Sequence, residues 1–448
     1  MNIVLIVLDS LRRDHLGCYG NDWIKTPNID RFASQSVTFD NAYAEGLPTI
    51  PVRTELVTGQ TSLPFREWQP LIPQDVTAAE LLGRYGYTCG LVADNYHLFE
   101  AGMNFHRAMH SFRWIRGQEC DAYKAGPAEV DTSRYVPPGM KGSFVEAMLG
   151  QYLRNVAGRE GEEQYFAAAV MSEAVKWLRE SSSSSPFFLW VDSFDPHEPW
   201  DPPPPFDTMY AEPAYDGHKI IHPNCGPTDW LSPDELANIK ALYAGEVSFV
   251  DKWVGKLLDA LDELKLAEDT LVLMLADHGH PHGDHGVMLK SPRGMYAELV
   301  RIPLMLRHPK GDYAGTRVDA LVQIRDVLPT LLDLAGLPAA IGVHGASMWP
   351  LVTGETDSLR ECVVCGWHQF EYRAVRDKRW ALVVTPSGQQ DELYDMASDP
   401  NEQTNVISAH PDVAERMRRF LGEYTYTKSA APPRQVQLRY EVEHTSAG

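Results

Sequence analysis

Three stretches of the chain are apolar at nearly every position, and polar side chains follow each of them. The stretches and the residues that follow are 2–8 (NIVLIVL) with Asp9, 186–191 (PFFLWV) with Asp195 and His197, and 270–276 (TLVLMLA) with Asp277 and His278. Strands that are apolar on both sides are typical of a parallel sheet covered by helices on both faces. Such sheets bind ligands at the carboxyl ends of their strands, so we expect these polar residues to gather at one edge.

Amphipathic helical segments alternate with further apolar strands along most of the chain. The helical segments are 77–85, 163–181, 232–264 and 325–335, and the further strands are 37–43, 88–93 and 301–307. This alternation predicts an α/β fold with a large, mostly parallel, doubly wound sheet flanked by helices. The region from Asn95 to about Met140 is rich in aromatic side chains and lacks this regularity, so we expect an irregular segment there.

The pattern changes near Arg360 to short strand-like pieces at 372–376 and 379–384, followed by one helix at 411–424. We therefore divide the chain into a large α/β domain, a small C-terminal α+β subdomain and a tail, with bounds 1–355, 356–428 and 429–448. The tail contains Pro432 and Pro433, and we expect it to serve as an arm in a homo-oligomer.

The 448 residues include 40 basic and 61 acidic side chains, which gives a formal charge of −21. This charge disfavours nucleic acid or an anionic membrane as a partner, and no apolar segment is long enough to span a bilayer. An anionic substrate would need a local positive site made from a metal ion and a few basic side chains. The opening apolar run is short and lacks the basic lead of a signal sequence, so we expect a cytoplasmic protein.

The six cysteines are scattered along the chain, and we expect them to remain reduced in that compartment. Cys362 and Cys365 are spaced like a redox or zinc pair, but they belong to an apolar, strand-like run without a second pair. We interpret both as structural side chains of a core strand.

Residues 47–59 (LPTIPVRTELVTG) predict a loop that leads into a short helix. Thr49 suits the N-cap position, Pro51 the first turn and Gly59 the stop. Unpaired N–H groups at this helix N-terminus, with the guanidinium of Arg53 one turn later, favour a tetrahedral oxyanion. Thr49 is therefore our candidate nucleophile.

Asp9, His197, Asp277 and His278 are expected to join Thr49 at the edge of the sheet. Carboxylates, an imidazole and a hydroxyl together suit a divalent cation that prefers oxygen ligands. Such an ion lowers the pKa of a bound hydroxyl and polarises the oxygens of a substrate.

The joint order of these residues resembles the sulfatase family of the alkaline phosphatase superfamily over nearly the whole chain. The motifs that carry the resemblance are 7–17 (VLDSLRRDHLG), 26–30 (TPNID), 41–44 (NAYA), 49–53 (TIPVR) with Leu56, Thr58 and Gly59, 197–199 (HEP), 277–279 (DHG), 283–286 (GDHG) through Lys290, 392–395 (ELYD) and 399–402 (DPNE). Together they are highly specific for the fold and less specific for the substrate.

The resemblance implies roles for the candidate residues. One divalent metal ion, Ca, Mn, Mg or Zn, would be bound by Asp9, Thr49, Asp277 and His278. Thr49 would also be the nucleophile, and Arg53 would steady either Thr49 or the bound oxyanion. His197 and Lys290 would contact the transferred group and protonate the leaving oxygen, which suits an imidazole and an ammonium.

The chain departs from the family pattern at two positions. Ser10 stands where sulfatases usually carry a second acidic residue, so the metal site holds one negative charge less. Thr49 stands where the family has a Cys or Ser that is oxidised to formylglycine, an aldehyde that threonine is not expected to give. A phospho-threonine is ordinary chemistry in relatives such as the nucleotide pyrophosphatases. We therefore predict hydrolysis of a small anionic substrate, a phosphate or phosphonate ester, through a covalent intermediate on Thr49.

Two other functions remain open. The first is a sulfatase that works without formylglycine and hydrolyses a sulfated Thr49 by attack at sulfur. The second is a catalytically weak binding protein that retains the fold. Converging polar groups at strand ends argue against the second, because they are costly to bury without a use.

Histidines at 278, 280, 282 and 285, with Asp195 as an optional further ligand, raise the alternative of a second metal ion. Substrate contacts are expected from the irregular region. The predicted substrate-binding residues are Asn95, His97 and Arg116, with Tyr96, Trp114 and Gln118 as further candidates.

Overall fold

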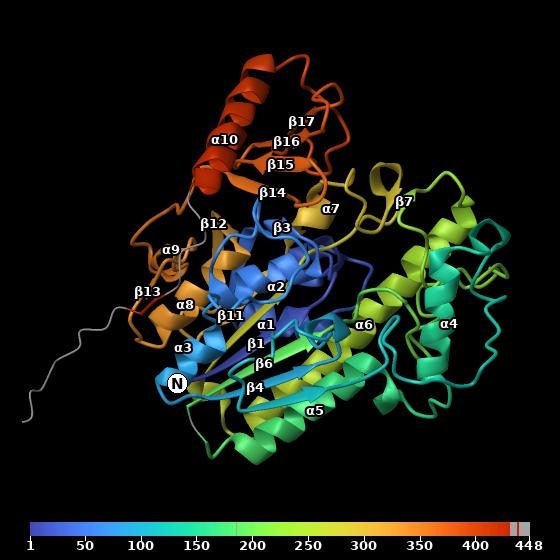
Figure 1. Ribbon diagram of the computed structural model, residues 1–448, viewed down its shortest axis with the longest axis horizontal. Coiled ribbons are helices and arrows are strands. Elements are labelled where there is room, and N and C mark those ends of the chain that lie inside the picture. Colours follow the sequence, from blue (N-terminus) through green and yellow to red (C-terminus); the bar gives the residue numbers. More distant parts are fainter. Residues whose placement is uncertain (185, 431–436, 439–448) are drawn as a thin grey trace, which may run out of the picture.

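The computed structural model describes residues 1–184, 186–430 and 437–438. Its centre is a nine-stranded sheet in the order β10-β2-β11-β8-β1-β6-β4-β5, with β12 paired to β2 (Figure 1). The strands are β1 (Asn2–Leu8), β2 (Val37–Tyr43), β4 (Thr88–Ala93), β5 (Ser111–Trp114), β6 (Phe187–Ser193), β8 (Thr270–Ala276), β10 (Arg301–Ile302), β11 (Leu304–Arg307) and β12 (Arg317–Gln323). The central strands β8, β1, β6, β4 and β5 are parallel to one another, whereas β11 is antiparallel to β8 and β2. The predicted α/β fold with a mostly parallel sheet is confirmed.

Helices cover both faces of this sheet because the chain crosses it in both directions. Three crossovers, from β1 to β2, from β5 to β6 and from β6 to β8, move along the sheet in the same direction. They carry α1 (Pro27–Ser34), α5 (Phe166–Ser181) and α6 (Pro233–Glu263). The return from β2 to β4 carries α2 (Thr49–Thr58) and α3 (Ala78–Arg84). Right-handed crossovers in opposite directions place their helices on opposite faces. Accordingly, α6 packs against α1 and α5, whereas α2 packs against α3 and α8 (Val327–Leu334).

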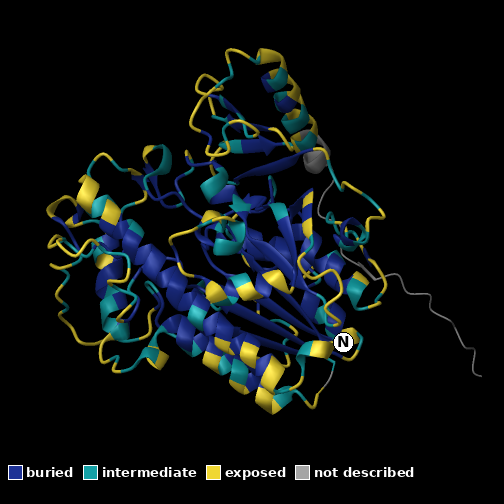
Figure 2. Ribbon diagram, turned by 180° about the vertical axis from the view of Figure 1, so that it is seen from behind, coloured by how far each residue is buried: buried dark blue, intermediate teal, exposed yellow. Residues whose placement is uncertain are grey.

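The central strands β1, β6 and β8 are buried throughout, and most exposed residues lie on the outer faces of the helices and in the loops (Figure 2). No helix in the described part of the chain combines the length and the apolarity needed to cross a membrane.

Some elements differ from the sequence-based expectation. The predicted strand 301–307 is divided at Pro303 into β10 and β11, because proline has no N–H to donate to a neighbouring strand. The region predicted to be irregular contains the edge strand β5, whose partly exposed residues lack an apolar run. Helix α4 (Phe144–Val156) and strand β12 were not predicted.

A second sheet forms the C-terminal subdomain, which stands apart from the large sheet in Figure 1. Its antiparallel strands are β14 (Val363–Trp367), β15 (Arg373–Arg376), β16 (Trp380–Val384) and β17 (Glu392–Asp395), and α10 (Pro411–Ala430) contacts β15. The predicted division at residue 355 falls between α9 (Trp349–Thr353) and β14. Strand β3 (Gly46–Leu47) extends this sheet by pairing with β14, so the segment just before Thr49 belongs to both parts of the molecule.

Short elements complete the fold. They are β7 (Gly226–Pro227), which pairs with β9 (Val287–Met288), α7 (Ala297–Val300), and β13 (Ala340–Ile341), which pairs with β18 (Gln437–Leu438). Most of the predicted tail, 429–448, lies outside the described residues, so the oligomer arm stays a prediction.

Cys362 and Cys365 are buried, and neither forms a disulfide. Their side chains belong to different apolar clusters, because residues three apart in an extended segment point to opposite faces. The interpretation of both as structural side chains is confirmed.

A buried ion pair ties the C-terminal subdomain to the large domain. Arg376 on β15 pairs with Glu402, and both side chains are almost fully buried. Glu402 Oε2 also accepts a hydrogen bond from the backbone N–H of Ala297, the first residue of α7, at 3.0 Å. The carboxylate therefore links β15 to the segment that follows Lys290.

We expect Arg376→Met to lower the free energy of unfolding by about 3–5 kcal/mol, because Glu402 remains buried without its counter-charge. Urea unfolding followed by tryptophan fluorescence measures the change. Arg379→Met, which removes the exposed pair with Asp395, is the control and should have a much smaller effect. Equal effects of the two substitutions would contradict the role assigned to the buried pair.

Candidate active site

Strand register brings the ends of β1, β6 and β8 to one level. Leu8 pairs with Ser193 on one side and with Ala276 on the other. Asp9 and Asp277 therefore leave neighbouring strands together, and Asp192 lies one residue before the end of β6. All three carboxylates are buried, with at most 1% of each residue exposed.

Arg53 is the cation that these carboxylates share. Its Nε and Nη2 donate to the two oxygens of Asp192 at 2.9 and 2.8 Å. Its Nη1 donates to Asp277 Oδ2 at 2.6 Å, and its Nη2 lies 3.0 Å from Asp9 Oδ2. Nη1 also donates to the backbone carbonyl of Thr49 at 3.2 Å. The Arg53 guanidinium thus holds Thr49 and the three carboxylates through four hydrogen bonds and one ion pair.

Asp192 was missed by the sequence analysis, which placed the polar end of this strand at Asp195 and His197. An acidic residue inside an otherwise apolar strand was the available signal, because a buried carboxylate needs a buried cation. Asp195 itself accepts hydrogen bonds from Gln118 Nε2 at 2.6 Å and from the N–H of Ala167 at 2.8 Å.

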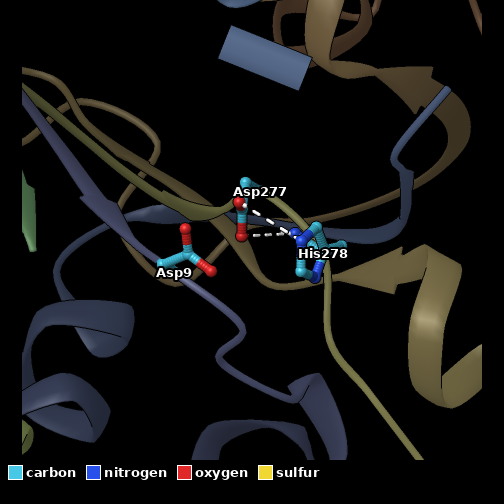
Figure 3. Close-up of side chains that lie close together, drawn as sticks. All are labelled: Asp9, Asp277 and His278. Carbon is cyan, nitrogen blue, oxygen red and sulfur yellow. Dashed lines mark hydrogen bonds and ion pairs between the residues drawn. The ribbon is translucent and has the colours of Figure 1, made fainter. Parts of the chain in front are cut away.

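Asp9, Asp277 and His278 form a cluster whose ligand atoms all lie within 4.8 Å of one another (Figure 3). His278 Nδ1 donates to the carbonyl of Gly279 at 2.9 Å, so the lone pair lies on Nε2. Nε2 is buried, has no hydrogen-bond partner and lies 3.5 Å from Asp277 Oδ2. Burial and the charge of Asp277 raise the pKa of Asp9 well above its usual range. An orphaned imidazole nitrogen beside two repelling carboxylates fits a divalent cation.

Ser10 organises this cluster where the sulfatase pattern has an acid. Its hydroxyl donates to Asp9 Oδ1 at 2.9 Å, and its backbone N–H donates to Asp277 Oδ1 at 3.0 Å. The hydroxyl and the backbone N–H of Ser10 thus orient the two carboxylates.

Thr49 is the first residue of α2 and is 2% exposed. Pro48 occupies the N-cap position, so the predicted cap is wrong by one residue. The predicted stop is confirmed, because Gly59 adopts a φ of 65° and its N–H donates to the Glu55 carbonyl at 2.8 Å.

The loop before Thr49 is held by its own helix. Glu55 Oε1 accepts from the N–H of Gly46 at 2.9 Å and from the Ser62 hydroxyl at 2.5 Å. A Cβ atom at Gly46 would overlap the Ser62 oxygen, so only glycine allows this approach.

His197 and Lys290 lie together, as predicted for the acid groups. His197 Nδ1 donates to the Glu198 carbonyl at 2.6 Å, so Nε2 carries the lone pair and accepts from Lys290 Nζ at 2.9 Å. Burial lowers the pKa of His197 to about 3, so the imidazole is neutral near pH 7. Burial opposes the charge of Lys290, but the Glu198 carboxylate outweighs it and raises the pKa of Lys290. The resting site therefore carries its proton on Lys290.

The three predicted substrate-binding residues have different positions. Asn95 is fully buried, and its Nδ2 lies 3.5 Å from Asp9 Oδ2, beside the metal cluster. His97 lies against Glu119, with its Nε2 3.7 Å from Oε2 of that residue. Arg116 instead binds both oxygens of Asp121 at 2.7 Å.

The further candidates from the irregular region serve this network or the packing of the loop. The Tyr96 hydroxyl donates to Glu119 Oε2 at 2.6 Å, and Gln118 binds Asp195 as described above. The guanidinium of Arg116 lies over the ring of Trp114, with Cζ of Arg116 4.0 Å from the ring centre.

The histidines of the loop after β8 point in different directions. His280 and His282 share a hydrogen bond of 2.7 Å, and His285 stacks on Tyr296 and lies 3.3 Å from Glu298. Within the described residues, the cluster of Asp9, Asp277 and His278 is the only set of three such ligands. The alternative of a second metal ion is therefore not supported.

Residues 1–337 match the family model described as Sulfatase. The chain belongs to the sulfatase family. Residues 283–425 also match the model of the N-sulphoglucosamine sulphohydrolase C-terminal region. The chain is 26% identical to an arylsulfatase of Clostridium perfringens, covering 91% of this chain and 90% of that protein. It is also 26% identical to an ulvan-active sulfatase of Formosa agariphila, covering 91% of this chain and 77% of that protein.

Solved structures of similar fold include two phosphonate monoester hydrolases. The one from Agrobacterium radiobacter has a TM-score of 0.74 at 21% identity and covers 98% of this chain and 99% of its own. The one from Silicibacter pomeroyi has a TM-score of 0.72 at 20% identity and covers 98% of this chain and 100% of its own. The family membership and the alkaline phosphatase-like fold predicted from the motifs are thus confirmed, and the chain is a sulfatase-like ester hydrolase.

We expect Asp192→Asn to weaken metal binding or activity about 10–100-fold, because Arg53 loses its bidentate partner and no longer orients Asp9 and Asp277. Isothermal titration with divalent cations and initial rates measure the two effects.

Asp75→Asn is the matched control, because Asp75 is buried and binds Arg66 with both oxygens at 2.6 and 2.9 Å outside this cluster. It should leave metal affinity unchanged. A wild-type metal affinity in Asp192→Asn would show that Asp192 has no part in the metal site.

Proposed function

We propose that this sulfatase-family hydrolase cleaves a phosphate or phosphonate ester through a covalent intermediate on Thr49. The observation that carries the proposal is a threonine at the first residue of α2, with its carbonyl held by the Arg53 guanidinium that binds the metal-site carboxylates. Threonine is a secondary alcohol and cannot give the aldehyde of formylglycine. The intermediate must therefore be released by attack of water at the transferred atom, which is ordinary chemistry for a phospho-threonine.

The proposed cofactor is one divalent metal ion, held by Asp9, Asp277, His278 and the hydroxyl of Thr49. When bound, it would supply positive charge that lowers the pKa of a hydroxyl and polarises the ester oxygens. The choice among Ca, Mn, Mg and Zn remains a prediction. Three carboxylates against one guanidinium leave a local excess of negative charge, which supports a cation at this position.

The first step moves one phosphoryl group and two protons. Thr49 Oγ1 gives its proton to a water molecule and bonds to phosphorus, and the bond from phosphorus to the leaving oxygen breaks with its electron pair on that oxygen. Lys290 donates a proton to the leaving oxygen, since its ammonium is the protonated group of the Lys290–His197 pair. Water then attacks phosphorus, and Thr49 regains its hydroxyl.

A sulfate ester is the second candidate substrate. It is favoured by the curated relatives, which include an arylsulfatase and an ulvan-active sulfatase. The same residues would then form a sulfated Thr49, which water must hydrolyse at sulfur. A binding protein without activity is the weakest alternative, because buried groups of opposite charge are arranged here around a nucleophile.

Thr49→Ala should lower kcat by about 1000-fold or more, because no other hydroxyl replaces the nucleophile. Thr49→Ser should retain measurable activity. Mass spectrometry of wild-type enzyme quenched during turnover should show a phosphoryl group on the peptide that contains Thr49. Full activity of Thr49→Ala would exclude the covalent mechanism.

Elemental analysis of active enzyme should give one equivalent of a divalent metal, and a chelator should abolish activity and lower the Tm. Removal of the ion leaves Asp9 and Asp277 to repel each other, and ligand binding to the native state alone stabilises it. Initial rates on aryl phosphate, phosphodiester, phosphonate and sulfate with Ca, Mg, Mn and Zn identify the ion and the ester. Two equivalents of metal, or full activity of metal-free enzyme, would overturn this assignment.

A further inference from the structure

Glu198 lies directly after His197, and basic side chains surround its buried carboxylate. Only 2% of the residue is exposed. Its Oε1 accepts a hydrogen bond from Lys290 Nζ at 2.7 Å and lies 3.8 Å from His222 Nε2. Its Oε2 lies 3.4 Å from His197 Nδ1 and 3.5 Å from His280 Nε2. The carboxylate is thus the common neighbour of one lysine and three histidines.

Lys290 has three N–H donors, and Glu198 determines how they are used. One donates to Glu198 Oε1, and a second donates to His197 Nε2 at 2.9 Å. Among the described residues the third meets no acceptor, so it is left for an oxygen of the substrate.

Glu198 also provides the main counter-charge of Lys290. Burial of an ammonium favours the neutral amine. The carboxylates that face Lys290 are Glu198, Asp9 at the end of β1 and Glu119 in the loop after β5, and Glu198 has the largest effect. His197, the other group in contact, is neutral and cannot replace this charge.

The other oxygen of Glu198 faces a second pair of buried groups. His280 and His282 are fully buried and hydrogen-bonded to each other at 2.7 Å. Trp200 and Tyr243 pack around both rings. The His280 ring thus borders Glu198 Oε2 without a hydrogen bond, while the other oxygen, Oε1, binds Lys290.

We propose that Glu198 is a positioning residue for ester cleavage, which holds Lys290 as an ammonium and directs its free N–H at the leaving oxygen. The inference rests on the proposed function, in which Lys290 supplies the proton. As the bond from phosphorus to the leaving oxygen breaks, that proton moves to the oxygen and Lys290 becomes a neutral amine, which regains a proton from water. Glu198 remains a carboxylate throughout.

The first test compares wild type, Glu198→Gln and Glu198→Asp on a phenyl and a 4-nitrophenyl ester. Glu198→Gln keeps the shape and removes the charge. We expect kcat for the phenyl ester to fall about 10–100-fold. The fall should be smaller for 4-nitrophenol, which leaves without needing a proton. In the pH profile of Glu198→Gln, the decline of kcat at high pH should begin at a lower pH than in wild type, because Lys290 loses its proton at a lower pH. Glu198→Asp should recover part of the lost kcat and part of the shift in the pH profile.

Glu162→Gln is the matched control. Glu162, which precedes α5, accepts from Lys252 Nζ at the same 2.7 Å and also from Trp253 Nε1, and both partners belong to α6. Its loss should change neither the dependence on the leaving group nor the pH profile.

A second measurement is independent of turnover. Nuclear magnetic resonance of isotope-labelled lysine side chains, with the Lys290 signal assigned through Lys290→Arg, should show a lower pKa of Lys290 in Glu198→Gln. Equal losses on both esters, an unmoved pH profile and an unchanged Lys290 titration would overturn the proposal. If the wild type cleaves only sulfates, the proposed function fails, and the same comparison on aryl sulfates together with the Lys290 titration still decides the role of Glu198.

Discussion

The guanidinium of Arg53 is the interaction on which the rest of this site depends. Three carboxylates buried side by side would repel one another and take up protons, as the raised pKa of Asp9 shows. Arg53 contacts all three of them, Asp9, Asp192 and Asp277, and it also holds the carbonyl of Thr49. One side chain thus joins the ends of β1, β6 and β8 to the first turn of α2. The same guanidinium therefore positions Thr49 and the three carboxylates relative to one another.

Backbone carbonyls decide which nitrogen of each key histidine is available. His197 donates from Nδ1 to the carbonyl of Glu198, and His278 does the same to Gly279. In both rings Nε2 is therefore left with its lone pair, facing Lys290 in one case and the carboxylate of Asp277 in the other. The same local geometry gives one imidazole to the proton-donating pair and the other to the metal cluster.

The C-terminal subdomain contributes to the site without supplying a catalytic group. Strand β3 pairs with β14 immediately before Thr49, and Glu55 within α2 accepts the N–H of Gly46 in that strand. The buried pair of Arg376 and Glu402 connects the same sheet to α7, which follows the loop of Lys290. The segments that carry Thr49 and Lys290 are therefore both connected to one small sheet.

The sequence by itself determined the fold class, the family and the residues at the ends of β1 and β8, because buried parallel strands and their terminal polar residues leave a local pattern. Its only signal for Asp192 was an acid inside an apolar strand, and it could not identify Glu198 as a site residue. The importance of both depends on cations contributed from α2 and from the loop after β8. It also left two uses for Arg53 open, and only the tertiary structure showed that its guanidinium contacts Thr49 and three buried carboxylates. Such pairings join residues far apart in the chain, so the physical reason for them exists only after the strands have been brought to one edge of the sheet.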